Sequence, residues 1–172
     1  MDIYYTIDEK YAQAAEEYRY GESAKALQLL NEIIANNAEY ARAHHLLGKV
    51  NFEDLKDYQT AGYHFKTCMA LEPSFPDNYT RYLELLVFLQ MDKQVKVVAA
   101  AALKVPGVDT ALIYKQLGLH EEKRRSFGEA LKAYHSAFMD AIDKEEMEEI
   151  EESIKRVKAK MQSVLKYQYQ SE

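Results

Sequence analysis

The sequence predicts an all-α protein made of four helical hairpins followed by one long terminal helix. The first observation is composition: the 172 residues include only 6 glycines and 3 prolines, and so few helix breakers favour long, uninterrupted helices. The second is an internal repeat of about 34–35 residues that occurs four times, a period typical of helix pairs arranged in an array. The third is a final segment of about 30 residues whose apolar residues recur at intervals of three and four, the spacing of one helical face.

The repeat is visible in three residue pairs about 35 positions apart and in a further residue about a dozen positions after each pair. The pairs are Leu47-Gly48, Tyr82-Leu83 and Leu117-Gly118, and the later residues are Ala61, Val95 and Ala130. A first unit fits less well but keeps the downstream spacing at Ala26. We expect hairpins over about residues 7–40, 41–75, 76–110 and 111–141, forming a repeat domain over residues 1–141.

Caps and breakers predict where the helices begin and end. Thr6, with Glu9 three residues later, is the pattern of a capping box and opens the first helix. Pro73 and Pro106 end second helices because proline cannot continue the backbone hydrogen bonding of a helix.

Two glycines inside the expected first helices, Gly48 and Gly118, predict where the two helices of a hairpin come close together. A glycine in mid-helix costs ~1 kcal/mol relative to alanine. We expect the cost to be tolerated here because the missing side chain lets the second helix approach.

These residues resemble the tetratricopeptide repeat (TPR), a helix–turn–helix unit of about 34 residues. The resemblance covers about residues 7–141 and departs from the pattern in two places: Gln13-Ala14 replace the Leu-Gly pair of unit one, and Leu83 replaces the Gly of unit three. It rests on Leu47, Gly48, Ala61, Phe65 and Pro73 in unit two, and on Tyr114, Leu117, Gly118, Ala130, Tyr134 and Ala137 in unit four. The resemblance implies an α-solenoid in which the first helix of each unit lines a concave groove that holds an extended peptide or a partner helix.

Carried onto this chain, the resemblance implies a groove that is locally basic in its middle, with aromatic residues beside the basic ones. Such a surface favours an acidic peptide whose apolar side chains rest on the aromatic rings. Arg42, His45 and Lys49 are expected to supply the charge, although basic residues at these positions also serve simply to keep a helical face soluble. The candidate ligand-binding residues are Tyr11, Tyr18, Arg42, His45, Lys49, Phe52, Glu84 and Lys115.

One specialised type of TPR groove is not matched by the sequence. Repeat domains that hold the acidic tails of heat-shock chaperones use a clamp of Lys, Asn, Asn, Lys and Arg. Only Arg81 matches it among the equivalent positions Tyr11, Ala15, Leu46, Asp77 and Arg81. The sequence therefore argues against a chaperone-tail clamp.

The final segment, residues 142–172, is expected to form one amphipathic helix that opens with Asp143 and Glu146 as a second capping box. Residues 143–152 carry seven acidic residues and one Lys, whereas residues 153–166 carry four Lys, one Arg and no acidic residue. One interpretation is a capping helix whose charges complement its own dipole. The other is an antiparallel homodimer through residues 147–165, in which acidic and basic halves meet. Its apolar seam consists of Met147, Ile150, Ile154, Val157, Met161 and Val164.

Several classes of function are disfavoured. The formal net charge of −6 argues against nucleic-acid binding, and the longest apolar stretch, residues 95–105, is too short to span a membrane. A single cysteine, Cys68, excludes an internal disulfide and a cysteine-based zinc site, and we expect it to be a buried packing residue. No paired metal-binding histidines, phosphate loop or nucleophile elbow occurs, so neither a metal, a cofactor nor an enzymatic activity is expected. Without an export signal, a cytoplasmic location is the simplest expectation.

Together these observations predict a non-catalytic adaptor or scaffold that binds a segment of a partner protein in its groove. Two alternatives stay open at this point. One is a structural role based on self-association through the last helix. The other is a small secretion chaperone of the TPR type, which the chain resembles in size and repeat content.

Overall fold

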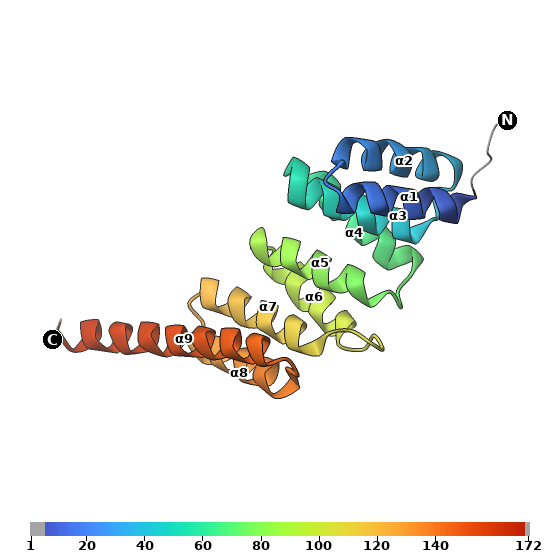
Figure 1. Ribbon diagram of the computed structural model, residues 1–172. Coiled ribbons are helices and arrows are strands. Elements are labelled where there is room, and N and C mark those ends of the chain that lie inside the picture. The colour runs from blue at the N-terminus through green and yellow to red at the C-terminus, as the bar shows by residue number, and fades with distance from the viewer. Residues whose placement is uncertain (1–5, 171–172) are drawn as a thin grey trace. The chain divides into compact units, whose positions relative to one another are not determined.

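The computed structural model describes the backbone of residues 6–170 and the side chains of residues 6–164, and Figure 1 shows its helices in chain order. Within that range the fold is all-α, with nine α-helices, one π-helical turn and no strand, as the sequence predicts. The chain divides into two compact units, Met1–Leu85 and Leu86–Glu172, and each is described by itself below.

Unit 1 contains two complete helical hairpins and most of a fifth helix. The predicted capping box is confirmed: the Glu9 backbone N–H donates to Thr6 Oγ1 at 3.2 Å, and the Thr6 N–H donates to Glu9 Oε2 at 2.7 Å. The apolar core joins the two hairpins and includes Leu30, Leu47 and Val50. The elements are α1 (Ile7–Arg19), α2 (Ser23–Asn36), α3 (Ala41–Val50), a π-helix (Asn51–Leu55), α4 (Tyr58–Leu71) and α5 (Pro76–Phe88), of which the last three residues belong to unit 2.

The π-helical turn at the end of α3 has no counterpart in the sequence analysis. The Asn51 side-chain amide donates to the Leu47 carbonyl at 2.8 Å, and the Asp57 N–H closes the wide turn on the Asn51 carbonyl at 2.9 Å. Lys56 ends the turn in the left-handed region with φ = 57°. Asp57 then caps α4, accepting from the Thr60 N–H at 3.1 Å. The chain thus extends α3 by one wide turn before it reverses.

The two mid-helix glycines lie where a side chain has no room. A Cβ atom added to Gly48 would sit 2.6 Å from ring carbons of Phe65, and one added to Gly118 would sit 2.7 Å from those of Tyr134. Each glycine therefore receives an aromatic ring from the second helix of its own hairpin. This contact is the physical reason for the Leu-Gly pairs in the repeat.

Unit 2 ends in a hairpin covered by a long last helix. The middle of the apolar seam of that helix, Ile150, Ile154 and Val157, is buried against α8 next to Tyr134 and Ala137. Asp143 accepts from the Glu146 N–H at 3.2 Å, which is one half of the expected capping box. The elements are α6 (Asp92–Ala102), α7 (Thr110–Lys123), α8 (Phe127–Asp140) and α9 (Lys144–Gln170).

Candidate functional site

A groove of about 350 Å³ in unit 1 brings together residues from α1, α3 and the segment that leads into α5. Four of the predicted binding residues line it: Tyr11 and Tyr18 from α1, and His45 and Lys49 from α3. We call it the unit-1 groove. Its remaining lining residues are Ala15, Arg19, Leu46, Phe75 and Asp77.

Tyr18 and Lys49 form one end of the unit-1 groove. The Lys49 Nζ lies 5.4 Å from the centroid of the Tyr18 ring, a cation–π distance. The Tyr18 hydroxyl donates to Glu53 Oε2 at 2.6 Å, and burial, together with this carboxylate, raises the pKa of Tyr18. Glu53 also lies 3.4 Å from Arg81 Nη1. The Tyr18 ring is therefore held in place, while Lys49 keeps its ammonium group for a ligand.

His45 contributes an aromatic wall rather than a positive charge. Its side chain is almost completely buried, and burial lowers its pKa to about 4. Because the Asn78 amide nitrogen donates to the Phe65 carbonyl at 2.9 Å, the Asn78 Oδ1 is an acceptor, so His45 Nδ1–H donates to it over 3.2 Å. The ring meets Phe75 edge-on with centroids 5.0 Å apart. The expectation that His45 supplies charge is therefore wrong, because the neutral ring is stabilised by desolvation.

Arg42 lies at the edge of the unit-1 groove. It is exposed, and its guanidinium carbon is 6.0 Å from the centroid of Phe75, a ring that lines the groove. Tyr11 packs its ring against Tyr40 with centroids 5.6 Å apart, and the Tyr40 hydroxyl donates to Asp8 Oδ1 at 2.7 Å. The groove therefore combines cations, Arg19 and Lys49 in its lining and Arg42 at its edge, with one carboxylate, Asp77, and with aromatic surfaces that are fixed by neighbouring contacts.

The other three predicted residues do not line this groove. Phe52 lies on the π-helix, with its ring edge-on to Tyr58 at 6.1 Å between centroids. Glu84 accepts from Arg81 Nη1 at 2.9 Å. Lys115 belongs to unit 2, where it donates to Glu149 Oε2 at 2.5 Å. Helical spacing predicts that all three lie on one face. It could not reveal that Glu84 and Lys115 already form ion pairs with other residues of the chain, Arg81 and Glu149.

Sequence reasoning also missed groove residues that lie outside the counted helix faces. Phe75 is the residue before α5, Asp77 lies in the first turn of α5, and Arg19 is the last residue of α1. Only the fold brings such end positions beside the helix faces.

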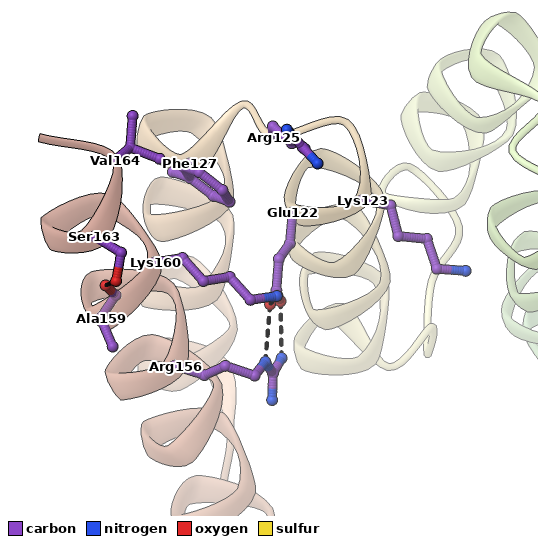
Figure 2. Close-up of a pocket in the computed structure, with 9 residues that line it drawn as sticks. All are labelled: Glu122, Lys123, Arg125, Phe127, Arg156, Ala159, Lys160, Ser163 and Val164. Atoms are coloured by element: carbon purple, nitrogen blue, oxygen red, sulfur yellow. Dashed lines mark hydrogen bonds and ion pairs between the residues drawn. The ribbon is translucent and has the colours of Figure 1, made fainter. Parts of the chain in front are cut away.

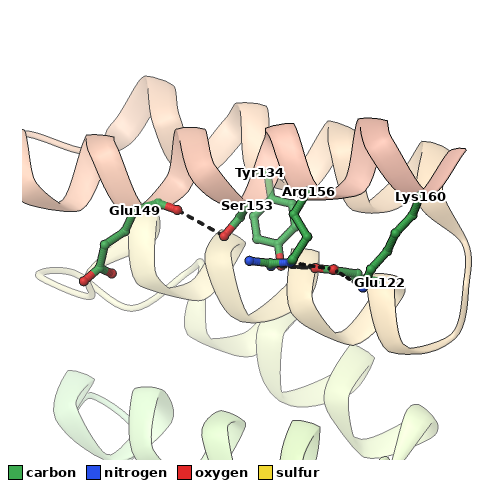
Figure 3. Close-up of polar contacts among 6 residues, drawn as sticks. All are labelled: Glu122, Tyr134, Glu149, Ser153, Arg156 and Lys160. Carbon is green, nitrogen blue, oxygen red and sulfur yellow. Dashed lines mark hydrogen bonds and ion pairs between the residues drawn. The ribbon is translucent and has the colours of Figure 1, made fainter. Parts of the chain in front are cut away.

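In unit 2, a buried carboxylate joins α7 to α9 (Figure 3). The Glu122 side chain is 4% exposed and accepts two hydrogen bonds of 2.8 Å from Arg156, one from Nε and one from Nη2. Lys160 Nζ donates to it at 2.7 Å, and the Tyr134 hydroxyl at 2.9 Å. The Arg156 hydrogen bonds, helped by those of Lys160 and Tyr134, outweigh burial and lower the pKa of Glu122 to about 2.

Around this carboxylate lies a cavity of about 650 Å³, which we call the basic pocket (Figure 2). Nothing in the sequence pattern singles it out, because Glu122 and Arg156 are 34 residues apart. At the end of α7, His120 and Glu122 are buried, whereas Lys123, Arg124 and Arg125 are exposed. Its lining residues are Glu122, Lys123, Arg125, Phe127, Arg156, Ala159, Lys160, Ser163 and Val164.

The described residues contain no group of three or more His, Cys, Asp or Glu side chains arranged to hold a metal ion. None of their helices combines the length and the apolar character that a membrane crossing requires. Cys68 is buried, as expected, and burial raises the pKa of its thiol to about 12.

Comparison with known proteins finds similarity in structure. No family model matches the chain, and no curated protein sequence matches it. A crystal structure of MamA superposes with a TM-score of 0.71 at 17% identity, covering 78% of each chain. PilW, described as a widely conserved type IV pilus biogenesis factor, has a TM-score of 0.67 at 16% identity, over 88% of this chain and 77% of its own. A thermophilic TPR protein from Thermus thermophilus has a TM-score of 0.67 at 19% identity, over 91% of this chain and 83% of its own.

The helices and the cavities define a helical-repeat protein with open, polar and aromatic surface grooves. Its fold is that of the TPR proteins, an all-α solenoid type, which confirms the resemblance read from the Leu-Gly pairs and their matching small residues.

Proposed function

We propose that this protein is a non-catalytic adaptor or scaffold that binds a peptide or helical segment of a partner protein in the unit-1 groove. The observation that carries the proposal is the meeting of Tyr11, Tyr18, His45 and Lys49 in one groove, with Arg42 at its edge. Lys49 and Arg42 each contact an aromatic ring, Tyr18 and Phe75 respectively, which leaves their charges available to a ligand.

The groove chemistry suits an acidic segment that carries an apolar side chain. Lys49 and Arg42 attract a carboxylate, and their rim position makes them act chiefly on the rate of association and on salt dependence. Aromatic side chains held rigidly in a groove give contact area at little cost in side-chain entropy, which is how a preformed site gains affinity. Tyr11 and Phe75 provide such rings. We place the protein in the cytoplasm, in keeping with its single, buried thiol.

The test is a paired affinity capture with the intact chain and an Arg42→Glu/Lys49→Glu variant. The matched control is Lys66→Glu/Lys93→Glu, which makes the same change in net charge at two exposed lysines that do not line the groove. Circular dichroism establishes that all three chains keep the same helicity. A protein held by the intact chain and the control but lost by the groove variant supports the proposal. Equal capture by all three refutes it.

For the alternative of a homodimer through residues 147–165, α9 offers less free apolar surface than the sequence of its seam suggests. Ile150, Ile154 and Val157 are buried against α8 of the same chain, which leaves Val164, 47% exposed, as the main apolar residue of the seam that is free to pair. This burial favours the adaptor function. Sedimentation equilibrium over a range of concentrations tests the dimer, because the mass of a dimerising chain rises with concentration. The secretion-chaperone alternative would be favoured by a stable one-to-one complex with an otherwise insoluble client.

A further inference from the structure

The basic pocket in unit 2 lies apart from the unit-1 groove in the sequence and shares no residue with it. It forms between the turn that joins α7 to α8 and the second half of α9 (Figure 2). None of the residues predicted to bind a ligand lines it.

The pocket is strongly positive although the chain as a whole has a net charge of −6. Four cationic residues and one carboxylate line it. The Lys123 amine points away from Glu122 (Figure 2), so the other three cations and the carboxylate give a net charge of +2. The carboxylate, Glu122, is already saturated, because Arg156, Lys160 and Tyr134 all donate to it. One carboxylate cannot neutralise two cations, and Arg156 and Lys160 remain 46% and 49% exposed. Glu122 therefore fixes these two side chains in position and leaves a positive charge between them.

Two more cations come from the end of α7 and the turn after it, and of these Lys123 points away from Glu122 (Figure 2). Lys123 donates to the Val87 carbonyl at 3.2 Å, a neutral partner that leaves its charge uncompensated. Arg125 is exposed with φ = 61°, and its side chain has no hydrogen-bond or ion-pair partner among residues 6–164. An exposed arginine of this kind is free to bind a carboxylate with both of its terminal nitrogens.

The opposite wall of the pocket is apolar. Phe127 is partly buried at the start of α8, and Val164 of α9 is 47% exposed. Ala159 of α9, a small residue, is also exposed and lines the pocket. Clustered positive charge beside an apolar wall matches a segment in which acidic residues alternate with an aliphatic one.

We propose that the basic pocket is a second protein-binding site, which takes an acidic peptide segment of a partner with an aliphatic residue among its carboxylates. The carboxylates pair with Arg125 and with the exposed sides of Arg156 and Lys160. The aliphatic side chain rests on Phe127 and Val164. Charge complementarity selects this occupant, since the pocket is positive in a chain whose net charge is −6.

The test uses the full chain and a fluorescein-labelled peptide, Glu-Glu-Leu-Glu-Glu-Leu, in fluorescence anisotropy at 50 mM salt. We expect Arg125→Glu to weaken binding at least about tenfold, because reversal turns an attraction into a repulsion. We expect Val164→Asp to weaken it as well, and a Gln-Gln-Leu-Gln-Gln-Leu peptide not to bind. Lys66→Glu is the matched control: it is exposed, lines neither cavity, and should leave the affinity within about twofold.

Three outcomes would overturn the proposal. Equal weakening by Arg125→Glu and Lys66→Glu would mean attraction by overall charge without a site. Loss of binding in Lys49→Glu but not in Arg125→Glu would move the peptide to the unit-1 groove, which would support the proposed function and refute this second site. Concentration-dependent self-association abolished by Arg125→Glu would identify the occupant as the acidic half of α9 from a second copy.

Discussion

Replacing Glu122 with glutamine should destabilise the protein more than any exposed carboxylate substitution. Glu122→Gln keeps the size of the side chain but removes the charge that two hydrogen bonds from Arg156 and one from Lys160 stabilise. These contacts hold the pKa at about 2, against an ordinary value of 4.5. Since one pKa unit corresponds to about 1.4 kcal/mol, the charged form contributes about 3 kcal/mol at pH 7.

The sign of the pH dependence follows from that depressed pKa. Between pH 4.5 and pH 2 the unfolded chain binds a proton at this site and the folded chain does not. The stabilisation is therefore complete above about pH 4.5 and is lost as the pH falls through about 2. At pH 3 about 1.4 kcal/mol of it remains. The difference in unfolding free energy between the natural chain and Glu122→Gln should shrink by about 2 kcal/mol from pH 7 to pH 3.

Urea denaturation followed by far-UV circular dichroism measures this difference, and amide hydrogen exchange of α9 reports it locally. The matched control is Glu129→Gln: this carboxylate is 62% exposed and pairs with Lys132 at 2.7 Å, so its loss should change the stability by less than about 0.5 kcal/mol. A loss below about 1 kcal/mol for Glu122→Gln at pH 7, or a difference that does not vary with pH, would refute the role assigned to Glu122.

Three further predictions concern the packed interior. Gly118→Ala should cost about 1–2 kcal/mol in urea denaturation, because its Cβ meets the Tyr134 ring at 2.7 Å and overpacking outweighs the gain in helix propensity. Gly128→Ala, with open space around it, should change the stability by less than about 1 kcal/mol, and equal losses would contradict the close-approach argument. The pKa of His64, lowered to about 4 chiefly by burial and then by His44, means that the unfolded chain binds more protons between pH 6.5 and 4. Stability should therefore fall as the pH falls through that range, and an NMR titration of the ring should have its midpoint near 4, not near 6.5. Cys68, with its pKa raised to about 12, should react with a disulfide reagent at pH 8 about 1000-fold more slowly in the folded chain than in urea, and fast labelling of the native chain would contradict its burial.

Local sequence determines much of the fold. Thr6 and Glu9 form the capping box that their spacing indicates, and Gly48 and Gly118 accept aromatic rings where the repeat pattern requires a missing side chain. Such features are readable because each depends on residues within one helix or one hairpin, at fixed offsets along the chain. The π-helical turn at Asn51–Leu55 is closed by the Asp57 N–H on the Asn51 carbonyl, and no offset in the sequence indicates it.

The unit-1 groove likewise has features that the sequence predicts and one that it does not. Helical spacing alone puts Tyr11 and Tyr18 on one face of α1, and His45 and Lys49 on one face of α3. Burial is a tertiary property, and it decided that His45 is neutral, because removing an imidazolium from water costs more than its hydrogen bond to Asn78 returns.

Only the tertiary structure determined the basic pocket. The sequence shows segregated charge along the last helix, with acidic residues first and basic residues after them. That pattern is compatible with a solvated helix, with a homodimer and with a clamp on another helix of the same chain. The burial of Ile150 and Val157 on α8 turns Arg156 and Lys160 toward Glu122. Sequence determined which residues are charged and which are apolar; packing determined which of those charges meet a partner within the chain and which remain available to another protein.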